Sequence, residues 1–399
     1  MHGRAVSQSK PKATSFSTFS KDYMKNLSAV SSLESTEGIV SENSFAAALD
    51  GLLEKSAGVR EKSFLQCAGL LQAFSVPEWS LESNQVTLME GIKKGFRSSS
   101  TERCLAARTA ALYGISLGTE SEPFFEGLKS SFEALISGSS DPLVKAEGVF
   151  SWATLAFIVG DTAENVEFIE KCMNWLPSAS SVFQIAILNS IAFCCSSLPT
   201  PTVNNTLVPK HAKTIGSHVA PSFDISVRIA AAQLVSLFFE FYRDGHEMND
   251  NDYDPYVLDG FMDVTQIIED LENVKAKNKT EQKRMNILFA GYGASIEQGF
   301  CPFTEEITLH HTTSNYTDWC SIIQIEWFRD YLQGGFHSHL VSNELLHQIF
   351  DIDPSLFVNK VKISKEDKRD YKSKNSFANK ERSKEKRRNQ RKGIKNDDD

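Results

Sequence analysis

The chain has 399 residues, of which 41% are hydrophobic, and its formal net charge at pH 7 is −9. This composition allows roughly two or three domains with buried cores and indicates a mostly folded, soluble protein. Seven cysteines at irregular spacing, with no CxxC pair, favour neither a disulfide framework nor a zinc module. The longest apolar stretch, from Val149 to Val159, is shorter than the ~20 residues that span a bilayer and predicts a buried helix.

Residues 1–41 are predicted to form a disordered N-terminal segment. From residue 7 to residue 41 the chain is rich in Ser, Thr and Lys and has little apolar periodicity. The stretch from Met1 to Lys21 carries several cations and no acid, so it loosely resembles a mitochondrial transit segment. Its low apolar content favours a disordered tail over a targeting segment.

Residues 42–300 are predicted to form an armadillo- or HEAT-like helical-repeat solenoid, so the fold class is all-α. Apolar residues follow the i, i+3, i+4 spacing of helices, and strand signals are scarce. Four segments begin with an apolar–basic pair and continue as a helix rich in small residues; their basic residues are Arg60, Arg108, Lys145 and Arg228. A weaker fifth copy begins at Ser181. The intervals of 48 and 37 residues, and then of 83 across the weaker copy, fit helical repeats of ~40 to 47 residues.

A second unit, predicted at residues 303–355, is short, helical, aromatic and rich in histidine. Its aromatic side chains could stack on unpaired bases, but we favour the interpretation that they form the core of the unit. Four residues are predicted to form a recognition edge, namely Trp319, His339, Asn343 and Glu344. The last three would lie along one side of a helix, and they could instead form an internal hydrogen-bond set.

The charge reverses near the end of the chain. Residues 360–395 hold 16 Lys/Arg and five Asp/Glu, a net charge of +11, whereas residues 1–359 carry −17. Such an arm is attracted to polyanions because bound cations release condensed counterions. We predict that the tail at 360–399 becomes helical on binding, although a solvated tail or a nuclear-localisation signal is also compatible. The predicted RNA-binding cations are Lys380, Arg382, Lys384, Lys386, Arg387, Arg388, Arg391 and Lys392.

No catalytic motif stands out in the sequence. The P-loop, GxGxxG, GxSxG and HExxH patterns are absent. His310-His311 and His337-Ser338-His339, with Cys320 and His347 nearby, contain atoms that bind metals but match no known ligand spacing. We therefore expect no enzyme activity, metal, cofactor or small-molecule substrate, and no membrane partner.

Three stretches resemble one known family. LDGLLEKSAGVR at 49–60 is similar to an LDGL-EKSA-x-x-R opening, and SVRIAAAQLVSLFFE at 226–240 is similar to a RIAAGE-type segment. The third, WCSIIQIEWFRDYLQGGFHSHLVSNELLHQIFDIDP at 319–354, is similar to a C-terminal module. They resemble the interferon-related developmental regulators, over about residues 42–385. The sequence departs from the family at His347, where Arg is expected, and at Asp353, where Gly is expected. Without that Arg the module lacks a permanent cation at position 347 that could contact phosphate.

The resemblance implies a non-enzymatic, armadillo-like protein. Family members are described as transcriptional co-regulators and as factors that occupy idle ribosomes, with the C-terminal part in tRNA sites and a terminal helix in the mRNA path. We expect a cytoplasmic, translation-silencing or ribosome-preserving factor whose partners are rRNA and ribosomal proteins. Its solenoid would hold the ribosomal surface, its module would occupy a tRNA site, and its tail would lie along rRNA. The alternative is a nuclear co-regulator that binds protein peptides on the solenoid, and some nuclear protein is compatible with either.

Overall fold

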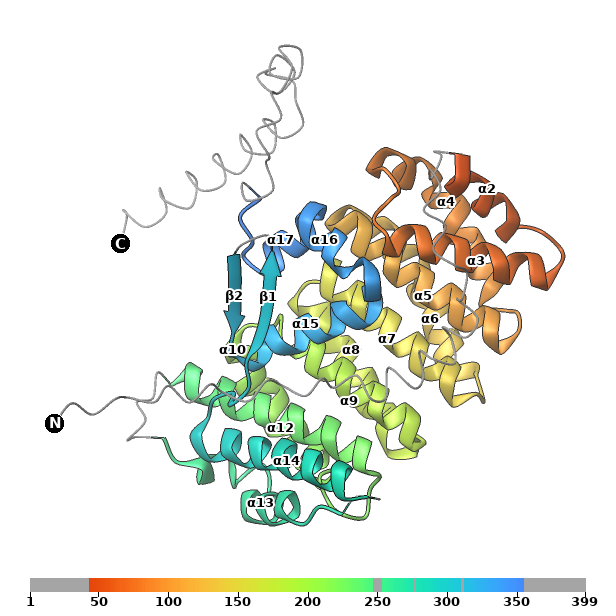
Figure 1. The fold of residues 1–399 in the computed structure, drawn as a ribbon. Coiled ribbons are helices and arrows are strands. Elements are labelled where there is room, and N and C mark those ends of the chain that lie inside the picture. The colour runs from red at the N-terminus through yellow and green to blue at the C-terminus, as the bar shows by residue number, and fades with distance from the viewer. Residues whose placement is uncertain (1–42, 247–252, 276–277, 310–311, 355–399) are drawn as a thin grey trace, which may run out of the picture. The chain divides into compact units, whose positions relative to one another are not determined.

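In the computed structural model of the protein (Figure 1), the residues described are 43–246, 253–275, 278–309 and 312–354. The repeats and the C-terminal module lie in one compact unit that ends at Ile352. The predictions made for residues 1–41 and for the basic tail at 360–399 lie outside the described residues.

Five helices pack side by side in chain order and form what we call the first layer. Their helical pattern and small residues were visible in the sequence, because each of the five repeat segments corresponds to one of them. The prediction of an all-α repeat solenoid is therefore confirmed. The helices of the first layer are α3 (Ala57–Gln72), α5 (Ser100–Leu117), α7 (Pro142–Val159), α9 (Ser181–Cys195) and α12 (Ile225–Gly245).

A second layer of helices covers one side of the first, and one helix stands at each end of the repeats. The second layer is made of α4 (Glu78–Gly95), α6 (Glu122–Gly138), α8 (Thr162–Trp175), α11 (Val208–Ser217) and α13 (Val264–Glu272), and the end helices are α2 (Asn43–Leu52) and α14 (Lys279–Gln298). The connecting turns are η1 (Gly118–Ser121), η2 (Leu176–Ser178), α10 (Thr200–Thr202), η3 (Val203–Leu207) and η4 (Pro255–Leu258).

Helix starts in the repeats follow local sequence signals. Asp141 caps α7 by accepting the backbone N–H of Leu143, and a proline follows it at the first helical position. Asp161 and Glu164 form a reciprocal capping box at the start of α8. These caps satisfy backbone donors that the first turn of a helix leaves unpaired.

Small residues let the first-layer helices approach each other closely. A Cβ atom at Gly114 of α5 would lie 2.4 Å from a methyl group of Leu155 in α7, so a larger residue there would require the Leu155 side chain to move. Helices α7 and α12 are long and apolar enough to cross a membrane by length and composition, but 67% and 78% of their apolar windows are buried inside the protein. Such burial is typical of core helices.

The C-terminal module begins with a hairpin that the sequence reading did not predict. Strands β1 (Glu305–Leu309) and β2 (Thr312–Tyr316) pair antiparallel, with Ile307 opposite Ser314. Strand β2 is polar and exposed over most of its length, so it lacks the alternation of apolar and polar residues that marks a strand in sequence. The hairpin is followed by α15 (Trp319–Leu332), the turn η5 (Gln333–Gly335), α16 (Phe336–Ser342) and α17 (Glu344–Ile349).

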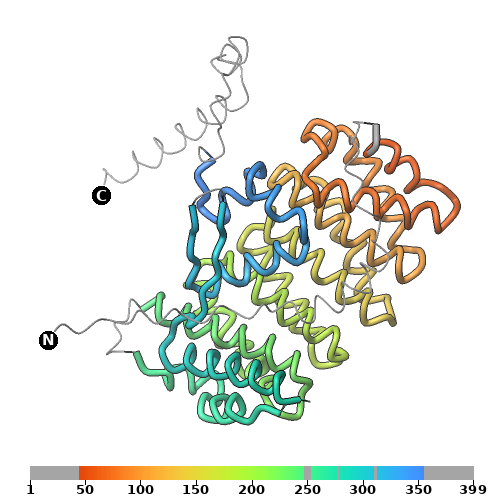
Figure 2. Tube along the Cα trace, viewed as in Figure 1, coloured from red at the N-terminus to blue at the C-terminus, as the bar shows by residue number. Residues whose placement is uncertain are grey.

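The module folds back along the first layer. Helix α15 packs against α9 and α12, and the turn η5 reaches α3 near the beginning of the described chain. Figure 2 shows the blue C-terminal segment beside the yellow and orange helices. The C-terminal module therefore returns along the repeats that precede it in the sequence.

Candidate functional site

A buried carboxylate of α12, that of Glu240, accepts hydrogen bonds from the backbone at the start of α15 and from Cys301. Glu240 Oε2 accepts the backbone N–H of Trp319 at 2.7 Å, and Oε1 accepts that of Cys301 at 3.2 Å. The indole Nε1 of Trp319 donates to Ser295 Oγ at 2.7 Å, and the ring stacks on Tyr292 with 5.7 Å between centroids. Trp319 is only 1% exposed. This member of the predicted edge fixes the start of α15 to α12 and α14.

Burial raises the pKa of Glu240 to about 8. The N–H groups of Trp319 and Cys301 stabilise the anion and lower this pKa, whereas the carboxylates of Asp318 and Asp244 raise it. Because desolvation is the largest of these effects, the carboxyl group holds its proton near neutral pH. The sequence reading missed Glu240, whose position within a long apolar helix was the available signal.

One face of α15 contacts successive first-layer helices. Gln324 Nε2 donates to Ser196 Oγ at the end of α9, at 3.0 Å. Trp327 Nε1 donates to Thr154 Oγ1 of α7 at 2.9 Å, and its ring stacks on Phe193 of α9 at a centroid distance of 4.2 Å. These contacts lie at i and i+3 along α15. The aromatic residues here form a core, as the favoured interpretation predicted.

The end of α15 is held by side chains of α3 and α5. Arg108 Nη2 donates to the carbonyl oxygens of Asp330 at 2.8 Å and Tyr331 at 3.2 Å, and Gln72 Nε2 donates to that of Tyr331 at 2.8 Å. The Arg108 guanidinium also lies over the Tyr331 ring, 4.8 Å from its centroid. Carbonyl groups at a helix end lack intrahelical partners, so these donors satisfy the last turn of α15.

His339 and Asn343 continue the contacts between the module and the repeats. His339 Nε2 lies 3.0 Å from the carbonyl oxygen of Leu71, so this nitrogen carries the proton. Asn343 Nδ2 lies 2.9 Å from His339 Nδ1 and donates to the carbonyl of Ile115 at 2.8 Å, while its Oδ1 accepts the N–H of Leu345 at 2.9 Å. Burial lowers the pKa of His339 to about 4, although the carbonyl that accepts from its ring opposes this shift.

The prediction that His339, Asn343 and Glu344 share one helix side is wrong. Asn343 lies between α16 and α17 with extended backbone, because its side chain caps α17. His339 and Asn343 are 0% and 3% exposed and bond to each other and to the repeats, which matches the internal hydrogen-bond set. Glu344 is exposed at the first position of α17.

Gly335 and His347 also make close contacts that hold the module in its conformation. A Cβ atom at Gly335 would lie 1.7 Å from the carbonyl oxygen of Gln72, so the backbones of the module and α3 meet there. His347, at the position where the related proteins are expected to have Arg, has Nε2 2.8 Å from the carbonyl of Leu340. Its imidazole is therefore engaged within the module.

Buried ion pairs connect neighbouring repeats of the first layer. Arg60 of α3 donates to both carboxylate oxygens of Glu102 in α5, at 2.6 and 2.9 Å. Arg108 of α5 faces Glu147 of α7 at 3.6 Å, and both glutamates are at most 1% exposed. The sequence reading found the basic residues but missed their acidic partners. Each partner follows its arginine by about one repeat, which was the available signal.

The described residues offer little for metal or acid–base chemistry. Among them no group of three or more His, Cys, Asp or Glu side chains could hold a metal ion. The pKa values of His339 and Glu240 are strongly shifted, but both side chains bond to backbone groups that seat the module. The eight predicted RNA-binding cations, Lys380 to Lys392, lie outside the described part of the chain.

Two stacked layers of repeat helices that carry a folded-back C-terminal module define an armadillo-like helical-repeat protein. The family model described as interferon-related developmental regulator matches residues 13–290, and the model of the interferon-related protein conserved region matches residues 343–392. The chain belongs to the interferon-related developmental regulator family.

Relatives from two mammals match most of the chain. Interferon-related developmental regulator 2 of Mus musculus is 24% identical over 334 residues, which cover 77% of this chain and 72% of the relative. Interferon-related developmental regulator 1 of Homo sapiens is 24% identical over 330 residues, which cover 78% and 71%. These names describe regulators and name no enzyme. The conserved region at 343–392 includes Asn343, α17 and all eight predicted RNA-binding cations.

Proposed function

We propose that this protein is a non-enzymatic factor that binds translationally inactive ribosomes and silences or preserves them. The observation that carries the proposal is the tail of net charge +11, which follows an acidic chain and lies almost entirely within the family's conserved region. Ribosomal RNA presents a dense array of phosphates to such a tail. Inhibition by occupancy requires no chemical step.

The way the module is held supports a role in positioning. Helix α15 and the pair His339–Asn343 form hydrogen bonds with backbone and side-chain groups of the repeats. The module that precedes the tail in the sequence is therefore held in place on the repeats. The exposed side of the module is polar, with His337, Ser338 and Glu344 among its residues. In the proposal this side meets a tRNA site and the tail lies along rRNA in place of mRNA.

The alternative, a nuclear co-regulator, is less well supported by the fold. Peptide binding on the solenoid needs an accessible face, and α15 covers the part of the first layer formed by α7, α9 and α12. No motif that reads a DNA groove is present in the sequence. We therefore retain the nuclear scaffold only as an outcome of the experiment below.

Sedimentation through a sucrose gradient tests the proposal. Tagged full-length protein from growing and from starved cells is compared with a chain that ends at Asn359. Full-length protein in the monosome peak and absent from polysomes, with loss of this peak in the truncated chain, is the expected result. Protein found only at the top of the gradient and in nuclei would instead favour the nuclear scaffold.

A further inference from the structure

Three lysines on the sides of the repeats, Lys129, Lys171 and Lys210, form ion pairs with glutamates of adjacent helices. Lys171 of α8 lies 2.9 Å from Glu133 of α6, and Lys210 of α11 lies 2.7 Å from Glu170 of α8. Such pairs leave little net positive field, in keeping with the charge of −17 over residues 1–359. A polyanion would be repelled by most of this surface.

The start of α14 is different. Residues 275–284 hold five Lys/Arg and one acid, Glu281. Four of the cations lie in the described part of the chain and are exposed, namely Lys275, Lys279, Lys283 and Arg284. Among the described residues none of the four forms an ion pair. This cluster, which we call the α14 patch, is therefore a surface of net positive charge on an acidic protein.

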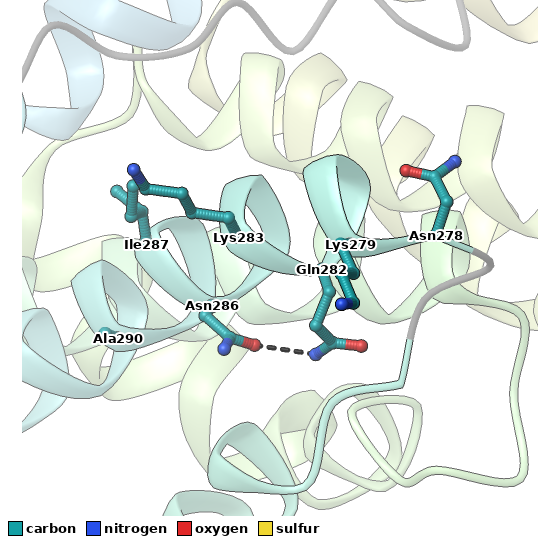
Figure 3. A pocket seen from close by; sticks show the side chains of 7 residues that line it. All are labelled: Asn278, Lys279, Gln282, Lys283, Asn286, Ile287 and Ala290. Atoms are coloured by element: carbon teal, nitrogen blue, oxygen red, sulfur yellow. Dashed lines mark hydrogen bonds between the residues drawn. The ribbon is translucent and has the colours of Figure 1, made fainter.

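The α14 patch borders a pocket of about 740 Å³ along one side of the helix (Figure 3). Its lining is basic, amide or apolar and includes no carboxylate; the residues are Asn278, Lys279, Gln282, Lys283, Asn286, Ile287 and Ala290. Gln282 Nε2 donates to Asn286 Oδ1 at 2.7 Å and to the carbonyl of Val274 at 2.8 Å. The Asn286 oxygen is thus occupied, and its amide N–H groups remain available as donors beside the lysines.

The position of α14 in the fold explains why this side is open. Helix α14 is the last repeat helix, and among the described residues no further repeat packs on it. A terminal helix needs a polar outer face for solubility, and mixed charges satisfy that need. A stretch with a net charge of +4, as at residues 275–284, exceeds that need, and like charges held close together are unfavourable unless a counter-charge binds.

We propose that the α14 patch is a second contact for the RNA backbone, separate in sequence from the basic tail. The inference rests on the proposed function, because it takes the bound polyanion to be RNA. Ammonium, guanidinium and amide N–H groups are the usual donors to phosphate oxygens, and such contacts position a protein without reading sequence. The pocket lining contains no aromatic side chain for base stacking, so binding here is independent of base identity.

The test compares two full-length variants with equal changes in charge. In the first, Lys275, Lys279, Lys283 and Arg284 are all replaced by Gln. In the matched control, four exposed cations from other parts of the chain are replaced by Gln, namely Lys55, Lys62, Arg97 and Lys213. All eight positions are on the surface, so thermal unfolding should be nearly unchanged in both variants.

The measurement is the affinity for a labelled 20-nucleotide single-stranded RNA between 50 and 200 mM KCl. Four phosphate contacts contribute about 3 to the slope of log affinity against log salt, so the α14 variant should lose about that amount. The control should keep a slope close to that of the parent chain. An equal loss in both variants, or no loss in the α14 variant, would overturn the proposal.

Two further arms separate this inference from its alternatives. If the chain that ends at Asn359 loses the salt dependence of RNA binding but the α14 variant does not, the α14 contact is refuted while the ribosome proposal stands. If the α14 variant loses affinity for a polyglutamate peptide but not for RNA, the patch serves an acidic protein and the RNA contact is refuted. Loss of RNA slope together with reduced monosome sedimentation supports the contact on ribosomes.

Discussion

The imidazole Nε2 of His339 lies 3.0 Å from the carbonyl oxygen of Leu71, although 268 residues separate the two in the sequence. This bond joins α16 of the C-terminal module to α3, the first helix of the first layer. Asn343 extends the connection to Ile115 at the end of α5. The segment that leads into the basic tail is therefore tied to the beginning of the repeats.

Replacing His339 by Ala should lower the free energy of unfolding by about 2 to 4 kcal/mol. The substitution opens a cavity and leaves the Leu71 carbonyl and the Asn343 amide with unsatisfied hydrogen-bonding groups. His337→Ala is the matched control, because His337 is exposed and lies two residues away; it should cost less than about 0.5 kcal/mol. Urea denaturation measures both. Equal effects would contradict the role assigned to His339.

The same histidine should make stability depend on pH. Burial lowers the pKa of His339 to about 4, whereas an unfolded histidine titrates near about 6.5. Below the unfolded value the unfolded chain binds a proton that the folded chain does not. The stabilisation is therefore complete above about pH 6.5 and is lost as pH falls to 4, up to about 3 kcal/mol. A His339→Gln variant should lack this step in urea unfolding measured from pH 7 to 4.

Glu240 should make the stability of the fold depend on pH in the opposite direction. Burial raises its pKa to about 8, compared with about 4.3 in the unfolded chain, so the folded protein holds the proton more tightly. Its contribution is complete below about pH 4.3 and is lost as pH rises through 8. Glu240→Gln should flatten this dependence between pH 5 and 8. It should also cost about 1 to 3 kcal/mol, because an amide nitrogen cannot accept from a backbone N–H.

A suitable control for Glu240 is Glu297→Gln, which changes an exposed carboxylate on α14. It should leave both the stability and its pH profile nearly unchanged. A Glu240→Gln variant with the pH profile of the parent chain would show that this carboxyl group titrates normally. Thermal unfolding at several pH values distinguishes the two cases.

The repeat architecture could be predicted because its signals are local. An apolar–basic pair followed by a helix rich in small residues is visible within about 15 positions, and it recurs at one repeat length. Each of the segments that begin near Arg60, Arg108, Lys145, Ser181 and Arg228 became a first-layer helix. Packing between such helices follows from the same small residues, as at Gly114.

The seating of the module could not be predicted because it depends on contacts across the whole chain. The sequence marked Trp319, His339 and Asn343 as special, but their polar atoms could have faced solvent or protein. These polar atoms face protein because they bond to the carbonyls of Leu71 and Ile115 and to the hydroxyl of Ser295. Backbone carbonyls carry no residue-specific signal, so no sequence pattern identifies them as partners.

Buried and exposed glutamates should differ sharply in their effect on stability. Glu102→Ala removes the partner of Arg60, whose guanidinium is mostly buried, and should cost about 3 to 5 kcal/mol. Glu90→Ala, on the neighbouring helix α4, removes a solvent-exposed pair with Lys93 and should cost less than about 1 kcal/mol. Chemical denaturation of the two variants measures the difference. A similar cost for both would show that the Arg60–Glu102 pair does not hold adjacent repeats together.

The basic tail should give ribosome binding a steep dependence on salt. If about eight cations contact rRNA phosphates, the affinity for purified vacant ribosomes should fall by roughly three to five decades between 50 and 200 mM salt. Charge-neutral replacement of six tail cations should flatten the slope; these are Lys384, Lys386, Arg387, Arg388, Arg391 and Lys392. A chain with residues 360–395 in shuffled order keeps the net charge of +11 and is the matched control. Since phosphate attraction does not depend on residue order, the shuffled chain should retain most of the slope. An unchanged slope in the neutral variant would exclude the tail as the main electrostatic contact.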